Sequence, residues 1–234
     1  MKNYLWSRFV FLMLVPCLFT YQPAQASNEH EYKLESSFKN SCTEEQRLHA
    51  CISAIDQRLI HVGMSVIDLD NFLGSEFAHE IPSNGAADKF STYKFGKAEF
   101  AWRLVIKYNG QGKVVGYYLN RLTQKGYSST EVPTALPADI GATFHIAKTP
   151  SQKLACAIHA IDTGVVRNGT PRSTLSAIFG ESTEEREVAP NWFVWSFSFG
   201  TSENSWRLIF SGNSDSIFEY YLTNFDWQPF QSHP

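Results

Sequence analysis

Cysteine and histidine lie close together at two places in the sequence, and these residue types are the most able to carry chemistry. His159 follows Cys156 by three residues, and His49 precedes Cys51 by two. Four such ligands could close a zinc site, and a Cys–His pair could supply a nucleophile with its base. The same cysteines also fit the apolar face of a packed helix. We therefore predict no metal, no cofactor and no enzymatic activity, and keep an enzyme or a small-ligand carrier as the second alternative.

Established catalytic motifs add nothing to the case for an enzyme. The sequence contains no Gly-x-Ser-x-Gly elbow, no phosphate-binding loop and no His-Glu-x-x-His motif. Asp56 and Asp162 occupy equivalent places in two similar segments, which suggests paired carboxylates. Each also stands where a helix is expected to end, and a carboxylate there accepts backbone N–H bonds.

The two aspartates belong to a duplicated unit. The segment AIDQRLIHVGMSVIDLDNFLG begins at residue 54, and AIDTGVVRNGTPRSTLSAIFG begins 106 residues later. Three further motifs recur in the same order: Phe-Gly and Trp-Arg-Leu at an offset of 104, and Tyr-Tyr-Leu at an offset of 103. Small drifts in offset are expected where loops gain or lose residues. The chain therefore contains two tandem copies of one unit.

Each copy is predicted to contain a helix, a short helix and a run of strands. Thr43 begins a capping-box pattern, and Thr149-Pro150 opens the matching helix in the second copy. Residues 100–108 and 206–210 alternate between apolar and polar side chains, as half-buried strands do. We predict an α+β fold of two tandem helix-loop-helix plus antiparallel-sheet units. Their sheets should join into one curved antiparallel sheet with helices on its convex face.

The N-terminus has the pattern of a secretory signal. Lys2 and Arg8 precede an apolar stretch that ends at Phe19, and the small residues Ala24 and Ala26 form a cleavage site. We predict cleavage after Ala26 and a periplasmic or secreted protein. Lipidation of Cys17 is not predicted, because Pro16 stands where a lipoprotein site carries a small residue.

The remaining chain divides by composition. We expect a signal peptide over 1–26, a polar mobile segment over 27–42, a first repeat unit over 43–122, a linker over 123–148, a second unit over 149–226 and a tail over 227–234. After cleavage, 18 basic residues face 23 acidic ones, and this balance offers no electrostatic case for nucleic acid. No later stretch is apolar enough to predict a membrane span. Cys42, Cys51 and Cys156 leave at least one thiol unpaired, and pairing of Cys51 with either of the others stays open.

Strand alternation points a set of polar and aromatic residues away from the helices. Arg103 and Arg207 each follow a tryptophan, Trp102 or Trp206, that is expected in the core, so each arginine faces the other side of the sheet. Arginine and tyrosine are enriched at interface hot spots. The plain interpretation is a solvated arginine paired with a cross-strand glutamate. The candidate contact residues are Lys94, Arg103, Lys107, Tyr118, Arg207 and Tyr221.

These patterns resemble a known fold family. HVGMSVIDLDNFLG, followed by YKFG and the hairpin WRLVIKYNGQGKVVGYYL, is similar to the unit of the outer-membrane-assembly lipoprotein small protein A. Two such units in tandem resemble the beta-lactamase inhibitory protein. Gly63, Gly74 and the turn from Gly110 to Val114 match the pattern, as do Gly169 and Gly180 in the second copy. The resemblance covers residues 43–122 and 150–225.

The resemblance implies an exported protein that binds another protein through the concave sheet face. It does not extend to inhibition of beta-lactamase, because the inhibitor carries one disulfide per unit and the second unit here has a single cysteine. We therefore expect a protein-binding or inhibitory protein, with a structural subunit of envelope assembly as the first alternative.

Overall fold

The computed structural model describes residues 34–36, 38–41, 43–74, 78–81, 89–98, 101–121, 136–201 and 205–224. The signal peptide, Cys42 and the C-terminal tail predicted above lie outside these residues. Cys51 and Cys156 carry free thiols, so the structure contains no bridge between them.

The first unit forms two helices followed by four strands. The helices are α2 (Glu44–Asp56) and α3 (Val66–Leu73), and the strands are β1 (Ala78–Ile81), β2 (Lys89–Lys94), β3 (Trp102–Tyr108) and β4 (Val114–Arg121). The Thr43 side chain accepts a hydrogen bond from the Gln46 N–H, and the Gln46 side chain accepts one from the Thr43 N–H. This reciprocal capping box satisfies two backbone donors and fixes where α2 begins.

The second unit repeats this order, and helix α4 (Pro137–Ile146) stands in front of it where the first unit has the helical residues 34–36 and 38–40. Its other helices are α5 (Pro150–Asp162) and α6 (Arg172–Phe179), and its strands are β5 (Glu184–Ala189), β6 (Trp192–Ser198), β7 (Arg207–Gly212) and β8 (Ile217–Thr223). Thr149 and Gln152 form the same capping box at α5 that Thr43 and Gln46 form at α2.

Two segments differ from the expected organisation. Helix α4 lies inside the predicted linker, and a Cβ on Gly141 would come within 2.8 Å of the Ala177 carbonyl oxygen of α6. Glycine is therefore required for the close packing of α4 against α6. Residues 34–36 and 38–40, within the predicted mobile segment, are helical. The Phe38 ring is fully buried and packs edge-on against Phe95, 5.7 Å away between centroids.

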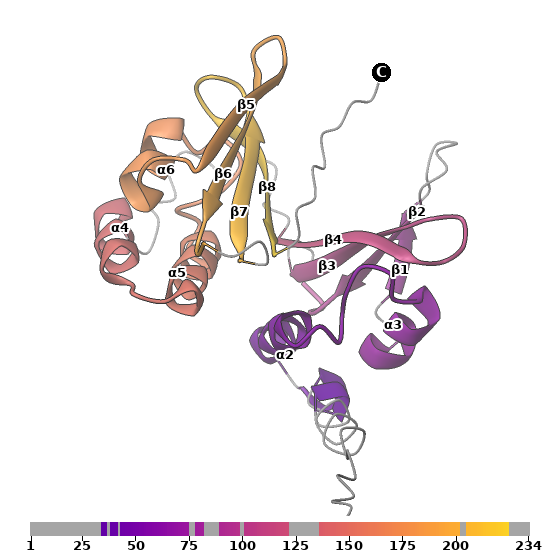
Figure 1. The fold of residues 1–234 in the computed structure, drawn as a ribbon. Helices are drawn as coiled ribbons and strands as arrows, with labels where there is room; N and C mark the ends of the chain where they lie inside the picture. The colour runs from indigo at the N-terminus through magenta and orange to yellow at the C-terminus, as the bar shows by residue number, and fades with distance from the viewer. Residues whose placement is uncertain are drawn as a thin grey trace, which may run out of the picture.

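All the described strands join in a single antiparallel sheet. Its order is β1-β2-β3-β4-β8-β7-β6-β5, and the two halves meet where Leu119 of β4 pairs with Leu222 of β8. Figure 1 shows the sheet bending at this junction, with α2 and α3 outside one half and α4, α5 and α6 outside the other. The predicted α+β fold with one curved sheet is confirmed.

The core lies between the helices and the facing side of the sheet. Trp102, Leu104 and Ile106 point inward from β3, while Leu208 and Phe210 do so from β7, and all are buried. Burying a leucine side chain stabilises the fold by about 1.5–3 kcal/mol. At the outer edge, β5 places acidic side chains and Arg186 along the unpaired strand, which disfavours pairing with another sheet.

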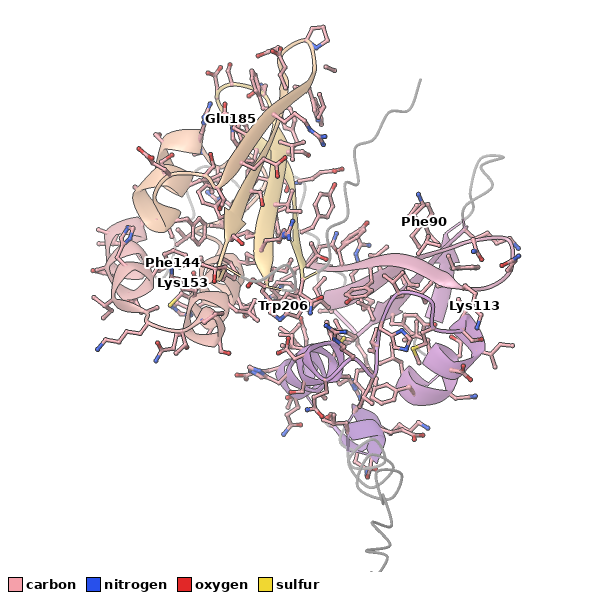
Figure 2. All side chains as sticks on the ribbon, viewed as in Figure 1. Phe90, Lys113, Phe144, Lys153, Glu185 and Trp206 are labelled. Atoms are coloured by element: carbon pink, nitrogen blue, oxygen red, sulfur yellow. The ribbon has the colours of Figure 1, made fainter. Side chains whose placement is uncertain are left out.

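The two units exchange hydrogen bonds across their junction, which we call the seam. The Trp206 Nε1–H of the second unit donates to Asp56 Oδ1 of the first at 2.7 Å, and Trp102 Nε1–H donates to Asp162 Oδ1 at 2.7 Å. Trp206 lies where the units meet (Figure 2). Asp56 matches Asp162 and Trp102 matches Trp206 in the duplication, so each unit donates to the other through the same residue types.

Two tyrosines repeat this exchange. The Tyr117 hydroxyl donates to Asn224 Oδ1 at 2.8 Å, and the Tyr220 hydroxyl donates to the Arg121 carbonyl oxygen at 2.6 Å. Tyr117 corresponds to Tyr220 in the repeat, and Asn224 corresponds to Arg121. The duplicated residues thus form a seam with approximate two-fold symmetry.

Changing Asp56→Ala should lower the free energy of unfolding by about 1–3 kcal/mol, because Trp206, only 5% exposed, keeps an N–H without its acceptor. Trp206→Phe should lower the free energy of unfolding by more than the roughly 1 kcal/mol of the lost hydrogen bond, because the smaller ring also leaves a cavity in the core. The double variant should lose less free energy of unfolding than the two single variants lose in total. Urea denaturation of the four proteins measures this coupling, with Glu181→Ala as the exposed control. A cost for Asp56→Ala no larger than that of Glu181→Ala would show that the seam bond contributes nothing.

Candidate binding face

The structure places all six predicted contact residues on one side of the sheet. Strand pairing sets Lys94 opposite Arg103, and Arg103 opposite Asn120. In the second unit Ile209 lies opposite Tyr221, and Arg207 opposite Thr223. We call this side, which carries Lys94, Arg103, Lys107, Tyr118, Arg207 and Tyr221 and faces away from the helices, the open face. It lies on the inner side of the bend in Figure 1.

An aromatic pair stands at the centre of the open face. The rings of Tyr118 and Tyr221 meet edge-on across the seam with their centroids 4.7 Å apart. Burial raises the pKa of Tyr118 to about 12. Burial also raises the pKa of Tyr221, and so does its hydrogen bond to the Glu219 carboxylate. Both phenols therefore stay neutral and act as hydrogen-bonding groups on an aromatic surface.

The Arg103 guanidinium is held by a neutral partner. Its Nε–H donates to Asn120 Oδ1 at 2.7 Å, and the two residues are direct cross-strand neighbours. Burial lowers the pKa of Arg103, an effect that the nearby Tyr118 and Tyr220 oppose. Among the described residues, no carboxylate forms an ion pair with Arg103. The cross-strand hydrogen-bond partner of Arg103 is thus Asn120 and not the glutamate of the plain interpretation, and it orients the guanidinium without neutralising it.

Two features of the face were missed in the sequence. Tyr221 is only 7% exposed, so it supports Tyr118 more than it offers contact area of its own. The floor between the charged residues is partly apolar, because Val105 and Ile209 point to this side and are nearly buried. Their alternation with core residues was visible in the sequence, but their closeness to Tyr118 and Tyr221 depends on the strand register.

The cysteine and histidine residues considered for chemistry lie on helices α2 and α5. Cys156 and His159 line a cavity of about 290 Å³ between α4 and α5, together with Asp139 and Thr143. Burial raises the pKa of the Cys156 thiol, which is the opposite of what a nucleophilic cysteine needs. Cys51 is fully buried and its pKa is raised as well. Within the described part of the chain, no group of three or more His, Cys, Asp or Glu side chains could hold a metal ion.

No protein-family model matches the chain, and no curated protein matches it. Among the described residues, no helix combines the length and apolar character needed to cross a membrane.

Cys156 should react with iodoacetamide more slowly than free cysteine does at mildly alkaline pH, because burial disfavours its thiolate. Cys51 should react only when the protein unfolds. Mass spectrometry of the alkylated protein over time measures both rates. An activated Cys–His pair would instead make Cys156 react faster than free cysteine, and His159→Ala would then slow it.

Proposed function

We propose that this is an exported protein-binding protein of inhibitory type, which contacts its partner through the open face. The observation that carries the proposal is the half-buried Arg103, which projects onto this face with Asn120 as its partner and no described carboxylate. A partly desolvated cation of this kind forms a strong, charge-assisted contact with a carboxylate from another molecule. A protein partner could supply such a group.

The residues around Arg103 favour a protein partner with an acidic surface. Lys94 lies directly opposite Arg103, and Lys107 lies further along the same strand, so the first half of the face is cationic. The Tyr118–Tyr221 pair adds a rigid aromatic surface beside it. Tyrosine and arginine are enriched among the few residues that dominate the binding energy of protein interfaces. The partner should therefore present acidic residues to the first unit and an apolar side chain to the tyrosine pair.

The duplication widens the sheet that is available for such an interface. A typical stable interface covers roughly 800 Å² on each partner. One four-stranded half would offer a narrow surface with an exposed edge at β4, whereas pairing of β4 with β8 joins both halves. The resemblance to the tandem inhibitor family points to the same use of the concave face. A structural subunit of envelope assembly is the first alternative, and it would associate with membrane machinery instead of a single soluble target.

Replacing Arg103→Glu and Arg207→Glu together should abolish capture of the partner from an envelope extract, because the reversed charges repel an acidic surface. The bait is the chain from residue 27 onward, and mass spectrometry identifies the captured protein. The matched control is Lys113→Glu with Lys148→Glu, which changes the net charge equally at two exposed positions away from the open face.

The wild-type and control baits should retain the same protein, and raising the salt concentration should weaken its binding. Equal retention by all three baits would contradict the proposed face. Retention of membrane machinery by all of them would favour the assembly subunit, and capture of no protein would favour a small-ligand carrier.

A further inference from the structure

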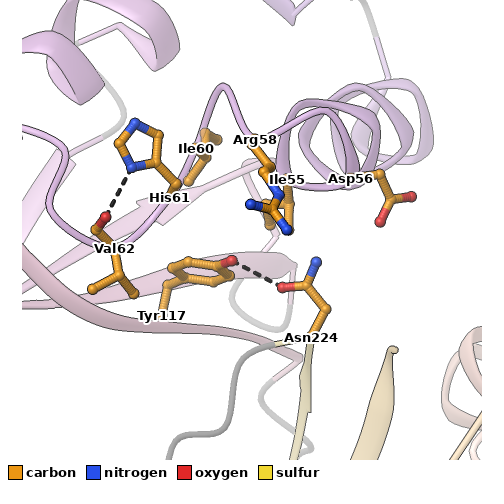
Figure 3. A pocket seen from close by; sticks show the side chains of 8 residues that line it. All are labelled: Ile55, Asp56, Arg58, Ile60, His61, Val62, Tyr117 and Asn224. Carbon is orange, nitrogen blue, oxygen red and sulfur yellow. Dashed lines mark hydrogen bonds between the residues drawn. The ribbon is translucent and has the colours of Figure 1, made fainter. Parts of the chain in front are cut away.

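A cavity opens at the seam on the helix side of the sheet, away from the open face. Its volume is about 490 Å³, within the range of roughly 300–1,000 Å³ that is typical of small-molecule sites. Figure 3 shows its lining, which comes from the end of α2, the loop that follows, β4 and the residue after β8. The lining residues are Ile55, Asp56, Arg58, Ile60, His61, Val62, Tyr117 and Asn224. Because Asn224 belongs to the second unit, both units contribute to this cavity.

The duplication provides an internal comparison for Arg58. Its counterpart is Gly164, and the two loops have the same backbone: Arg58 N–H donates to Ile55 O at 3.0 Å, and Gly164 N–H donates to Ile161 O at 3.0 Å. Both residues are left-handed, with φ of 60° at Arg58 and 74° at Gly164. This backbone conformation costs a non-glycine residue about 1–2 kcal/mol. The first unit therefore carries an arginine at a position where the fold favours glycine.

The Arg58 side chain has no ion-pair or hydrogen-bond partner among the described residues. Its guanidinium points toward the Tyr117–Asn224 pair (Figure 3). The Asn224 oxygen accepts from the Tyr117 hydroxyl, so the Asn224 amide nitrogen remains available to donate into the cavity. Two donor groups, one of them charged, thus face the same space, as in sites that bind a carboxylate.

The same comparison shows that Asp56 has fewer partners than its counterpart in the second unit. Its counterpart Asp162 accepts from Trp102 and in addition pairs with the Arg121 guanidinium. The residue that corresponds to Arg121 is the shorter Asn224, so Asp56 keeps only its Trp206 hydrogen bond among the described residues. The Asp56 carboxylate turns away from Arg58 in Figure 3, and no ion pair joins the two. The cavity thus holds a carboxylate and a guanidinium apart, each without a charged partner in the described part of the chain.

We propose that the seam cavity binds an aliphatic α-amino acid in its zwitterionic form. The ligand carboxylate accepts from the Arg58 guanidinium and the Asn224 amide, and the ligand ammonium group pairs with Asp56. The apolar side chain contacts Val62, which is 39% exposed at the cavity wall. The ligand then occupies the place that Arg121 fills at the equivalent position of the other unit. This site is separate from the open face and goes beyond the proposed protein binding.

The test is isothermal titration calorimetry of the chain from residue 27 onward with L-leucine, L-isoleucine, L-valine and L-methionine at millimolar concentrations. At least one should bind saturably. L-leucinamide lacks the carboxylate and 4-methylpentanoate lacks the ammonium group, so each should bind about tenfold or more weakly than L-leucine. Bound ligand should also raise the melting temperature, because it bridges the two units.

Two variants test the assigned contacts. Arg58→Gly restores the residue of the other unit, so it should fold with an undiminished melting temperature and weaken binding about tenfold or more. Asn224→Arg should imitate Arg121, pair with Asp56 and abolish binding. Gly164→Arg is the matched control outside the cavity and should leave affinity unchanged. Equal affinity in wild type and Arg58→Gly, equal binding of L-leucine and L-leucinamide, or no saturable binding by any of the four amino acids would overturn the proposal.

Discussion

The exchange of tryptophan–aspartate hydrogen bonds across the seam is the constraint on which the rest of the structure depends. Trp102 and Trp206 are core residues of their own units, yet each places its one N–H on the aspartate that ends a helix of the other unit. A buried indole N–H without an acceptor is costly, so each unit is complete only against its neighbour. The exchange accompanies the β4–β8 pairing and makes two half-sheets one curved surface.

Some seam contacts repeat in both units, and others differ between the units. The aspartates, tryptophans and tyrosines that repeat all form hydrogen bonds between the units. Each of these contacts needs a residue from both copies. Arg58 against Gly164 and Asn224 against Arg121 break the pattern within the same framework. Arg58 and Asn224 line a cavity on one side of the seam, whereas Arg121 pairs with Asp162 on the other. The open face is asymmetric as well, because the first unit contributes Lys94, Arg103 and Lys107 and the second contributes Arg207.

Much of the fold could be predicted from the sequence because the signals were local and occurred twice. Capping boxes at Thr43 and Thr149, together with strand alternation around Trp102 and Trp206, determine helices, strands and faces without knowledge of the partners. Helix α4 was missed because its segment contains little helical periodicity and a glycine whose role depends on contact with α6. The Arg103–Asn120 contact, the burial of Tyr221 and the seam cavity depend on register and on residues over 100 positions apart. Local patterns do not contain that information.

The most direct test of the account is site-specific photo-crosslinking in living cells. A photoreactive amino acid would replace Lys107 on the first half of the open face or Val194 on the second, and a third protein would carry it at Lys148 on the helix side. If one partner covers a face built from both units, positions 107 and 194 should crosslink the same protein, and position 148 should not. Crosslinks from position 148 alone, or different proteins from the two open-face positions, would contradict a single binding surface formed across the seam.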